Sequence, residues 1–117
     1  MLSLENMREI LVEAAKRRRV VTYRDIAGVL EVRPPNTIHQ VTDTLERLME
    51  EDAAAHRPFI AALAVSGTLG GLPRQGFFDC AGRLGRFAGD PDGQDAGTYH
   101  AHELTAAFAY WGIPGER

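Results

Sequence analysis

The side chains with the clearest chemical potential in this sequence follow a proline pair near its middle. Apolar residues recur at helical spacing through residues 37–51, which places the intervening polar residues on the opposite face of a helix. Asparagine, glutamine and arginine can form paired hydrogen bonds with base edges in the major groove of DNA. The alternative is an ordinary solvated helix face. We predict that the groove contacts come from Asn36, Thr37, His39, Gln40 and Arg47.

A second set of candidate residues is mainly cationic and surrounds this helix in the sequence. Residues 16–19 read Lys-Arg-Arg-Arg, a run that suits DNA phosphates but also suits the negative end of a helix dipole. We predict that the phosphate contacts come from Lys16, Arg18, Arg19, Tyr23, Arg24 and Arg74.

Other reactive residue types do not form a convincing site. His100 and Glu103 could share a helical face, but His102 would lie off it, so surface histidines are the preferred interpretation. Residues 90–95 lack the full acidic series of a calcium loop. Cys80 has apolar neighbours, which favours an inert buried thiol. We therefore expect no catalytic residue, no metal and no cofactor.

Helical periodicity and capping residues predict the elements that position these side chains. The expected helices cover residues 4–18, 23–30 and 37–51, with Ser3, Thr22 and Asn36 as their respective caps. A short helix over residues 79–87, a loop over 88–97 and a last helix from Thr98, ended by Gly112 and Pro114, complete the chain.

A β-hairpin is predicted between the third and fourth helices. The apolar run 59–65 ends at a Ser-Gly turn signal, and residues 72–78 read as an irregular edge strand. A helix, a turn, a helix and then a hairpin is the order of a winged helix-turn-helix. The predicted fold is therefore α+β: a winged helix-turn-helix with a hairpin wing at 59–78 and an additional C-terminal helix.

Composition limits the class of protein. The 117 residues suit a single domain, with a core over 4–78 and an extension over 79–117. No run of about 18 apolar residues is present, the N-terminus lacks a signal-peptide pattern, and the single cysteine excludes an internal disulfide. We expect a cytoplasmic protein without membrane contact. The net charge of −3 counts against strong non-specific binding of nucleic acid.

Residues 21–27, Val-Thr-Tyr-Arg-Asp-Ile-Ala, resemble the DNA-binding domain of alkylguanine-DNA alkyltransferases and alkyltransferase-like proteins. That family has a similar tyrosine-x-x-isoleucine-alanine helix, a recognition helix, a proline-cysteine-histidine-arginine motif and a wing, an order kept over roughly residues 4–78. His39 falls at the family's arginine finger, which replaces a flipped base, and Ala55 falls at its cysteine nucleophile, followed by His56 and Arg57. The resemblance therefore implies DNA binding without alkyl transfer.

Residues 64–78 are more similar to small uncharacterised bacterial winged-helix domains, some of which are found beside nuclease domains. The function expected from the sequence is non-enzymatic binding of duplex DNA, with the helix at 37–51 in the major groove and the hairpin as a wing. The alternative is a protein-interaction module or homodimer, with Phe108, Tyr110 and Trp111 of the last helix as the partner surface. An enzyme using His56 or Cys80 is a third, weaker possibility.

Overall fold

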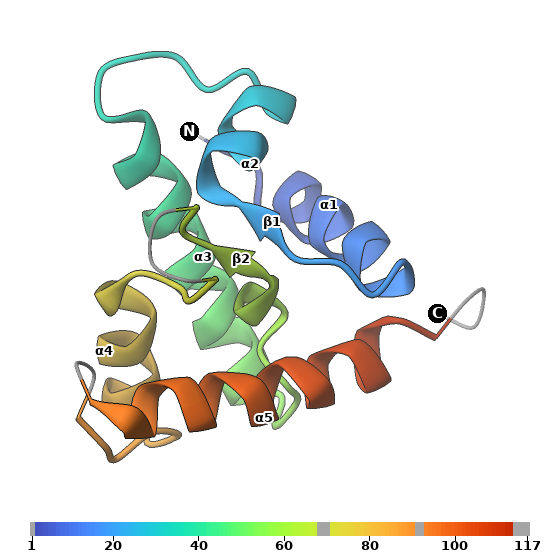
Figure 1. Ribbon diagram of the computed structural model, residues 1–117. Coiled ribbons are helices and arrows are strands. Elements are labelled where there is room, and N and C mark those ends of the chain that lie inside the picture. The colour runs from blue at the N-terminus through green and yellow to red at the C-terminus, as the bar shows by residue number, and fades with distance from the viewer. Residues whose placement is uncertain (1, 68–70, 91–92, 114–117) are drawn as a thin grey trace.

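The computed structural model describes residues 2–67, 71–90 and 93–113 and is predominantly helical (Figure 1). In chain order the elements are α1 (Leu4–Lys16), β1 (Val21–Thr22), α2 (Tyr23–Val29), α3 (Thr37–Ala54), the 3-10 helix η1 (Ile60–Leu63), β2 (Ala64–Val65), α4 (Gln75–Arg83) and α5 (Gln94–Trp111). The two strands are parallel, with Val21 opposite Ala64 and Thr22 opposite Val65.

The first three helices lie where the sequence predicts them, and their caps explain two of the starts. The Ser3 hydroxyl accepts a hydrogen bond from the Asn6 N–H at 3.2 Å, and the Thr22 hydroxyl accepts one from the Asp25 N–H at 3.1 Å. The expected cap at Asn36 differs. Its backbone is left-handed, at φ 61°, and its side chain makes no capping hydrogen bond. The link between α2 and α3 is also an extended loop rather than a tight turn (Figure 1).

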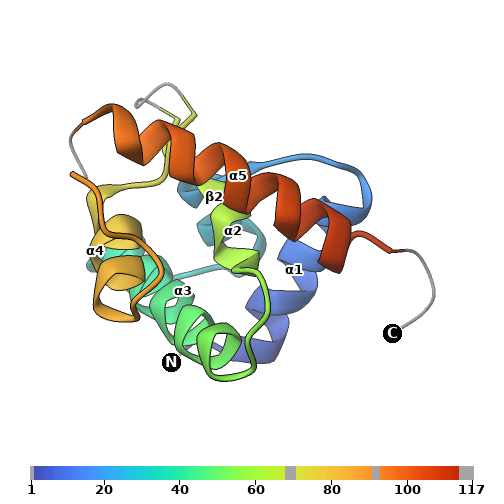
Figure 2. The ribbon, with the colours of Figure 1, turned by 90° about the horizontal axis from the view of Figure 1, so that it is seen from below.

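The core surrounds the segment that joins α3 to β2. Every residue from Phe59 to Val65 is buried, and α1, α3 and α5 all pack against η1. Seen from below, α5 lies across the molecule and covers this segment (Figure 2). A chain surrounded by helices on several sides is apolar throughout, which explains the continuous apolar run in the sequence.

The predicted hairpin wing is wrong. Residues 60–63 form a 3-10 turn, β2 pairs with β1 in parallel, and residues 75–83 are the helix α4. A backbone hydrogen bond from Ser66 to the Leu72 carbonyl, 2.8 Å long, brings the two arms together, but the described residues form no antiparallel ladder. Residues 68–70, at the expected tip, lie outside the described part of the chain. The α+β winged helix-turn-helix is thus replaced by a helical fold with one two-residue parallel pair.

Two local features explain why residues 72–78 form no strand. Pro73 has no N–H to give to a ladder, and the Arg74 N–H donates to the Tyr23 hydroxyl at 2.8 Å. Arg74 then serves as the N-cap residue of α4, from which Phe77 and Phe78 enter the core.

The last two helices both begin earlier than the sequence predicts. The short helix expected at 79–87 is α4, from Gln75 to Arg83, and α5 begins at Gln94 rather than after Thr98. Helix α5 ends before Gly112, as predicted, whereas Pro114 lies outside the described residues.

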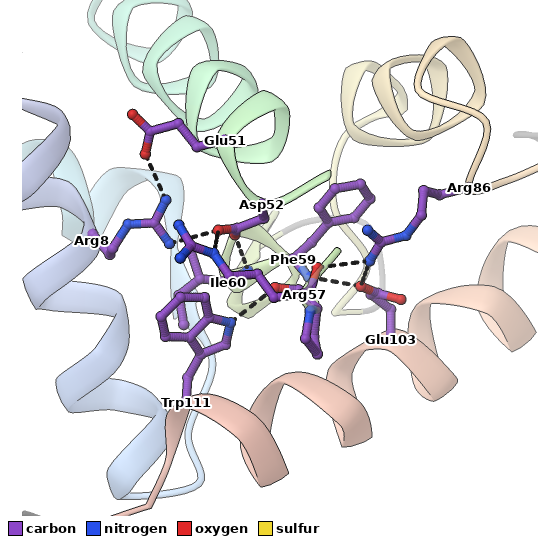
Figure 3. A network of polar contacts seen from close by, with 10 residues as sticks. Arg8, Glu51, Asp52, Arg57, Phe59, Ile60, Arg86, Glu103 and Trp111 are labelled. Carbon is purple, nitrogen blue, oxygen red and sulfur yellow. Dashed lines mark hydrogen bonds and ion pairs between the residues drawn. The ribbon is translucent and has the colours of Figure 1, made fainter. Parts of the chain in front are cut away.

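A fully buried carboxylate, Asp52, joins α1, α3 and the segment before η1 (Figure 3). Its Oδ1 accepts hydrogen bonds from Arg8 at 2.8 Å and from Arg57 at 2.7 Å, and its Oδ2 accepts one from the Ile60 N–H at 3.0 Å. Both guanidinium groups also lie about 5 Å from the ring of Trp111, at 5.0 and 5.1 Å. Asp52 therefore ties α5 to the core through the two arginines.

A second ionic contact fixes the middle of α5 (Figure 3). Glu103 Oε2 accepts hydrogen bonds from the Phe59 N–H at 2.7 Å and from Arg86 at 2.8 Å. The Trp111 indole N–H donates to the Pro58 carbonyl at 2.9 Å, and the residue is only 7% exposed. Trp111 is therefore part of the protein's own core rather than of the partner surface predicted on the last helix, whereas Tyr110 is 39% exposed.

His56 occupies a backbone position that normally suits glycine. It follows the C-cap of α3 at φ 57°, where its N–H bonds the Ala53 carbonyl and the next N–H bonds the Asp52 carbonyl. Because a left-handed conformation strains a residue with a Cβ, His56→Gly should raise the free energy of unfolding by about 0.5–1 kcal/mol. Gly85, at φ 79° after α4, is the matched control, and Gly85→Ala should lower it by about 1 kcal/mol. Urea unfolding measures both; a destabilised His56→Gly would contradict this account.

His100 makes the docking of α5 sensitive to acid. Its Nε2 lies 2.8 Å from the Ala62 carbonyl in the core, and burial lowers its pKa from 6.5, partly offset by that hydrogen bond. Below pH 6.5 the unfolded chain binds a proton that the folded chain resists. The free energy of unfolding therefore keeps its full value above this pH and falls as the pH drops through it.

Urea unfolding between pH 7.5 and 5.5 should show a slope of up to about 1.4 kcal/mol per pH unit. His100→Gln should remove that slope, whereas the exposed neighbour variant His102→Gln should keep it. An unchanged slope in His100→Gln would refute the assignment.

Candidate nucleic-acid interface

A polar groove of about 500 Å³ lies where α2, α3 and α4 begin, beside the end of β2. It is lined by Thr22, Tyr23, Arg24, Ala27, Thr37, Ile38, Ser66, Gly67 and Arg74. The parallel pairing of Thr22 with Val65 brings the start of α2 next to the chain after β2, and the Tyr23–Arg74 hydrogen bond adds the start of α4. The groove thus unites residues that are far apart in the sequence.

The chemistry of this groove suits an anion. Arg24 and Arg74 are both exposed and supply positive charge, while Thr22 and Thr37 supply hydroxyl groups. The first turn of α3, an 18-residue helix, begins at Thr37 and adds the positive end of its dipole. A phosphate group could accept hydrogen bonds from all these donors.

Tyr23 supports this groove from inside. The residue is 5% exposed, its hydroxyl oxygen accepts the Arg74 N–H, and burial raises its pKa, an effect that the hydrogen bond and charge of Arg74 partly offset. The Arg74 guanidinium lies 5.8 Å from the centre of the Tyr23 ring. Tyr23 was predicted to contact phosphate; the contact that the structure shows is the hydrogen bond that its hydroxyl accepts from the Arg74 N–H.

The eleven arginines that the structure describes divide into three groups by what they contact. Five form ion pairs with carboxylates: Arg8, Arg47, Arg57, Arg83 and Arg86. Arg18 stacks on Phe108 at 6.0 Å and Arg74 on Tyr23. Four exposed arginines contact neither a carboxylate nor a ring among the described residues: Arg17, Arg19, Arg24 and Arg33. These four follow one another from the end of α1 to the loop before α3 (Figure 1).

The predicted phosphate contacts differ in their availability. Arg19 and Arg24 are exposed without such a partner, whereas Lys16 forms an ion pair with Glu13 at 3.4 Å. Arg18 stays exposed despite its contact with Phe108. Arg74 lies on the groove rather than at a wing tip. Of the predicted set, Arg24 and Arg74 line the groove, whereas Arg19 is exposed outside its lining.

The predicted groove contacts on α3 also differ from one another. Asn36 and His39 are exposed and Thr37 lines the groove. Arg47 lies further along the helix, with its Nε 3.9 Å from the Asp43 carboxylate. Gln40 directs its amide nitrogen back to the preceding loop, where it donates to the carbonyls of Arg33 and Pro35 at 2.9 and 3.0 Å. The exposed first turn of α3 is thus the part best placed for an external contact.

A smaller cavity of about 260 Å³ lies on the other side of Tyr23 and Arg74, which line both spaces. Its apolar wall is formed by Leu45, Met49, Ala61 and Phe77, and its polar wall by Tyr23, Thr42, Glu46, Arg74 and Gln75, with Gly76 completing the lining. Burial raises the pKa of Glu46, an effect that Arg83 opposes and that Asp43 and Glu50 reinforce. The lining includes no cysteine, serine or histidine that could act as a nucleophile.

The remaining reactive side chains form no site in the described part of the chain. Burial raises the pKa of the Cys80 thiol to about 11, so it is protonated at neutral pH. Ala55, where the resemblance places a nucleophile, is the exposed C-cap of α3. His102 is exposed as predicted, but the surface position predicted for His100 is wrong: it is buried, so the two side chains do not converge. No group of three potential metal ligands occurs among the described residues.

Comparisons with protein-family models, curated proteins and solved structures found no match for this chain. Within the described residues, none of the helices combines the length and hydrophobicity needed to cross a bilayer.

Sequence reasoning missed two of the four arginines without a partner, Arg17 and Arg33. Arg17 lies inside the predicted basic run and could have been included on position alone. Arg33 stands beside two prolines, and that proline-rich turn was treated only as a helix breaker.

Proposed function

We propose that this protein binds duplex DNA without catalysing a reaction, through the groove at the start of α2, α3 and α4 and the exposed arginines between the end of α1 and the loop before α3. The observation that carries this proposal is the division of the arginines. Five are paired with carboxylates, whereas Arg17, Arg19, Arg24 and Arg33 are exposed and have no carboxylate or ring partner among the described residues. Unpaired arginine side chains are the groups that replace counterions on a phosphate backbone.

The charge distribution of α3 supports the same orientation. The helix is about 27 Å long at 1.5 Å per residue, so its acidic end at Glu50 and Glu51 is far from its first turn. The first turn, with Asn36, Thr37 and His39, would approach the groove of the duplex while the acidic end points away. Asp25, Glu31 and Asp43 remain nearby, and the net charge is −3. Because contacts between arginines and phosphates release counterions, binding should weaken steeply as the salt concentration rises.

The alternative of a partner surface on the C-terminal helix receives less support. Trp111, its largest predicted contact, is buried against Arg8 and Arg57. We therefore propose no second function.

Fluorescence anisotropy of a labelled duplex of about 20 base pairs, titrated at 20 mM salt, tests the proposal. We expect saturable binding that is lost on raising the salt to 200 mM. Arg83→Ala is the control variant, because that arginine pairs with Glu50 outside the groove, and it should bind as the wild type does. Absence of binding at 20 mM salt would refute the proposal.

A further inference from the structure

The loop before α3 is exposed and yet held in place. Residues 33–36, Arg-Pro-Pro-Asn, are all exposed and project at one end of the molecule (Figure 1). The two prolines restrict φ, and the Gln40 side chain donates to the carbonyls of Arg33 and Pro35 at 2.9 and 3.0 Å. Fixing a glutamine side chain costs roughly 1–2 kcal/mol of conformational entropy. Water could satisfy these exposed carbonyls equally well, so core packing does not explain the clamp.

The two hydrogen bonds from Gln40 to the loop also limit the contacts that its side chain can make with DNA. A glutamine amide nitrogen has two hydrogens, and here two carbonyls accept from it. Bidentate recognition of adenine requires the amide nitrogen as a donor to N7 while the amide oxygen accepts from N6. Gln40 would therefore have to release the loop before it could read a base in this way.

Arg33 is the residue of this loop that can bind a phosphate. It is exposed and contacts neither a carboxylate nor a ring within the described ranges, whereas five other arginines are ion-paired. An arginine on a preorganised loop loses less freedom on binding than one on a mobile loop. Its guanidinium can donate two parallel hydrogen bonds to one phosphate.

We propose that the 33–36 loop is a preformed contact for the phosphate backbone of duplex DNA, with Arg33 as the contacting residue and Gln40 as the positioning residue. The inference rests on the proposed DNA binding and deepens it. It replaces the expectation from the sequence that Gln40 reads a base edge, and it adds a contact, in the loop before α3, that the groove lining does not include.

A double-mutant cycle on the full chain tests this inference, with anisotropy of the labelled duplex at 20 mM salt as the measurement. Arg33→Ala should weaken binding roughly 5- to 10-fold, the equivalent of about 1–1.4 kcal/mol, and lower the slope of log K against log salt by about 0.9. Gln40→Ala should weaken it roughly 3-fold, by loosening the loop. The double variant should bind no more weakly than Arg33→Ala alone, because Gln40 acts only through Arg33.

Controls separate this inference from the proposed function and from unfolding. Thermal unfolding should show that Gln40→Ala stays folded at the assay temperature. Gln40→Met, which removes both donors while keeping a neutral side chain of similar length, should behave like Gln40→Ala in binding. If the wild type binds DNA but Arg33→Ala binds equally well, the inference fails while the proposed function stands. It also fails if the two losses multiply in the double variant, or if Gln40→Ala changes the ranking of several duplex sequences, since direct base contact predicts both. A wild type that does not bind refutes the proposed function itself.

Discussion

Asp52→Ala should lower the free energy of unfolding by about 3–5 kcal/mol, the largest effect on stability that we expect from one side chain in this fold. The carboxylate is fully buried and accepts hydrogen bonds from Arg8, Arg57 and the Ile60 N–H. Alanine would leave the partly buried Arg57 without its carboxylate and Arg8 with only the exposed Glu51 as a counter-charge. Because single domains are stable by only about 5–15 kcal/mol, this loss would remove a large share of the total.

Urea unfolding followed by circular dichroism measures the change. Glu51 provides the matched control, because it pairs with the same Arg8 at 2.8 Å but is 48% exposed. Solvent screens that pair, so Glu51→Ala should cost no more than about 1 kcal/mol. If Asp52→Ala is largely unfolded, Asp52→Asn, which keeps one acceptor oxygen, should be folded but still clearly destabilised. Equal effects of Asp52→Ala and Glu51→Ala would contradict the central role assigned to the buried carboxylate.

The combined variant Arg17→Ala, Arg19→Ala and Arg24→Ala should weaken binding of duplex DNA roughly 100-fold at 20 mM salt. Each arginine is exposed without a carboxylate or ring partner in the described part of the chain, so each is available to a phosphate. A charge-assisted contact worth about 1 kcal/mol at low salt, repeated three times, gives a loss of this size. The fold should remain intact, because none of the three residues belongs to the core.

The three single variants allow a comparison with Arg83→Ala at equal change in net charge. Each removes one positive charge, as Arg83→Ala does, but Arg83 is tied to Glu50 away from the groove. We expect a loss of about 5-fold for each single variant and less than 2-fold for Arg83→Ala at 20 mM salt. A similar loss from all four would mean that overall charge, rather than this surface, controls binding.

Local sequence signals were sufficient to predict the first half of the fold. Ser3 and Thr22 cap their helices as expected, and the apolar residues Val41, Leu45 and Leu48 face the core from α3. These features depend on contacts between neighbours in the sequence, which periodicity and capping rules describe well.

The second half of the fold depends on contacts that no local pattern contains. All residues of the run Phe59–Val65 are apolar because helices surround it. A short apolar run of this kind is equally compatible with a buried strand and with a buried turn. The Arg74 N–H finds its partner in Tyr23, 51 residues away, which removes it from any hairpin. The predicted wing was wrong for this reason.

The candidate site was predictable in part. Arg19, Arg24 and Arg74 were identified from their residue type and position; Arg24 and Arg74 line the groove, and Arg19 is exposed outside its lining. The sequence could not predict which arginines form ion pairs with carboxylates, because pairs such as Arg83 with Glu50 join distant parts of the chain. Gln40 was expected to face outward, and only the structure reveals its two bonds to the preceding loop.

The central claim is that the exposed arginines between the end of α1 and the loop before α3 bind a phosphate backbone, and the salt dependence of binding tests it most directly. Log K for the labelled duplex should be measured against log salt, from 20 to 200 mM, for the wild type and for the variant lacking Arg17, Arg19 and Arg24. Each phosphate contact contributes about −0.9 to the slope, so the variant should have a slope shallower by about 2–3. Parallel lines for the two proteins, or no binding by the wild type at 20 mM salt, would contradict the account.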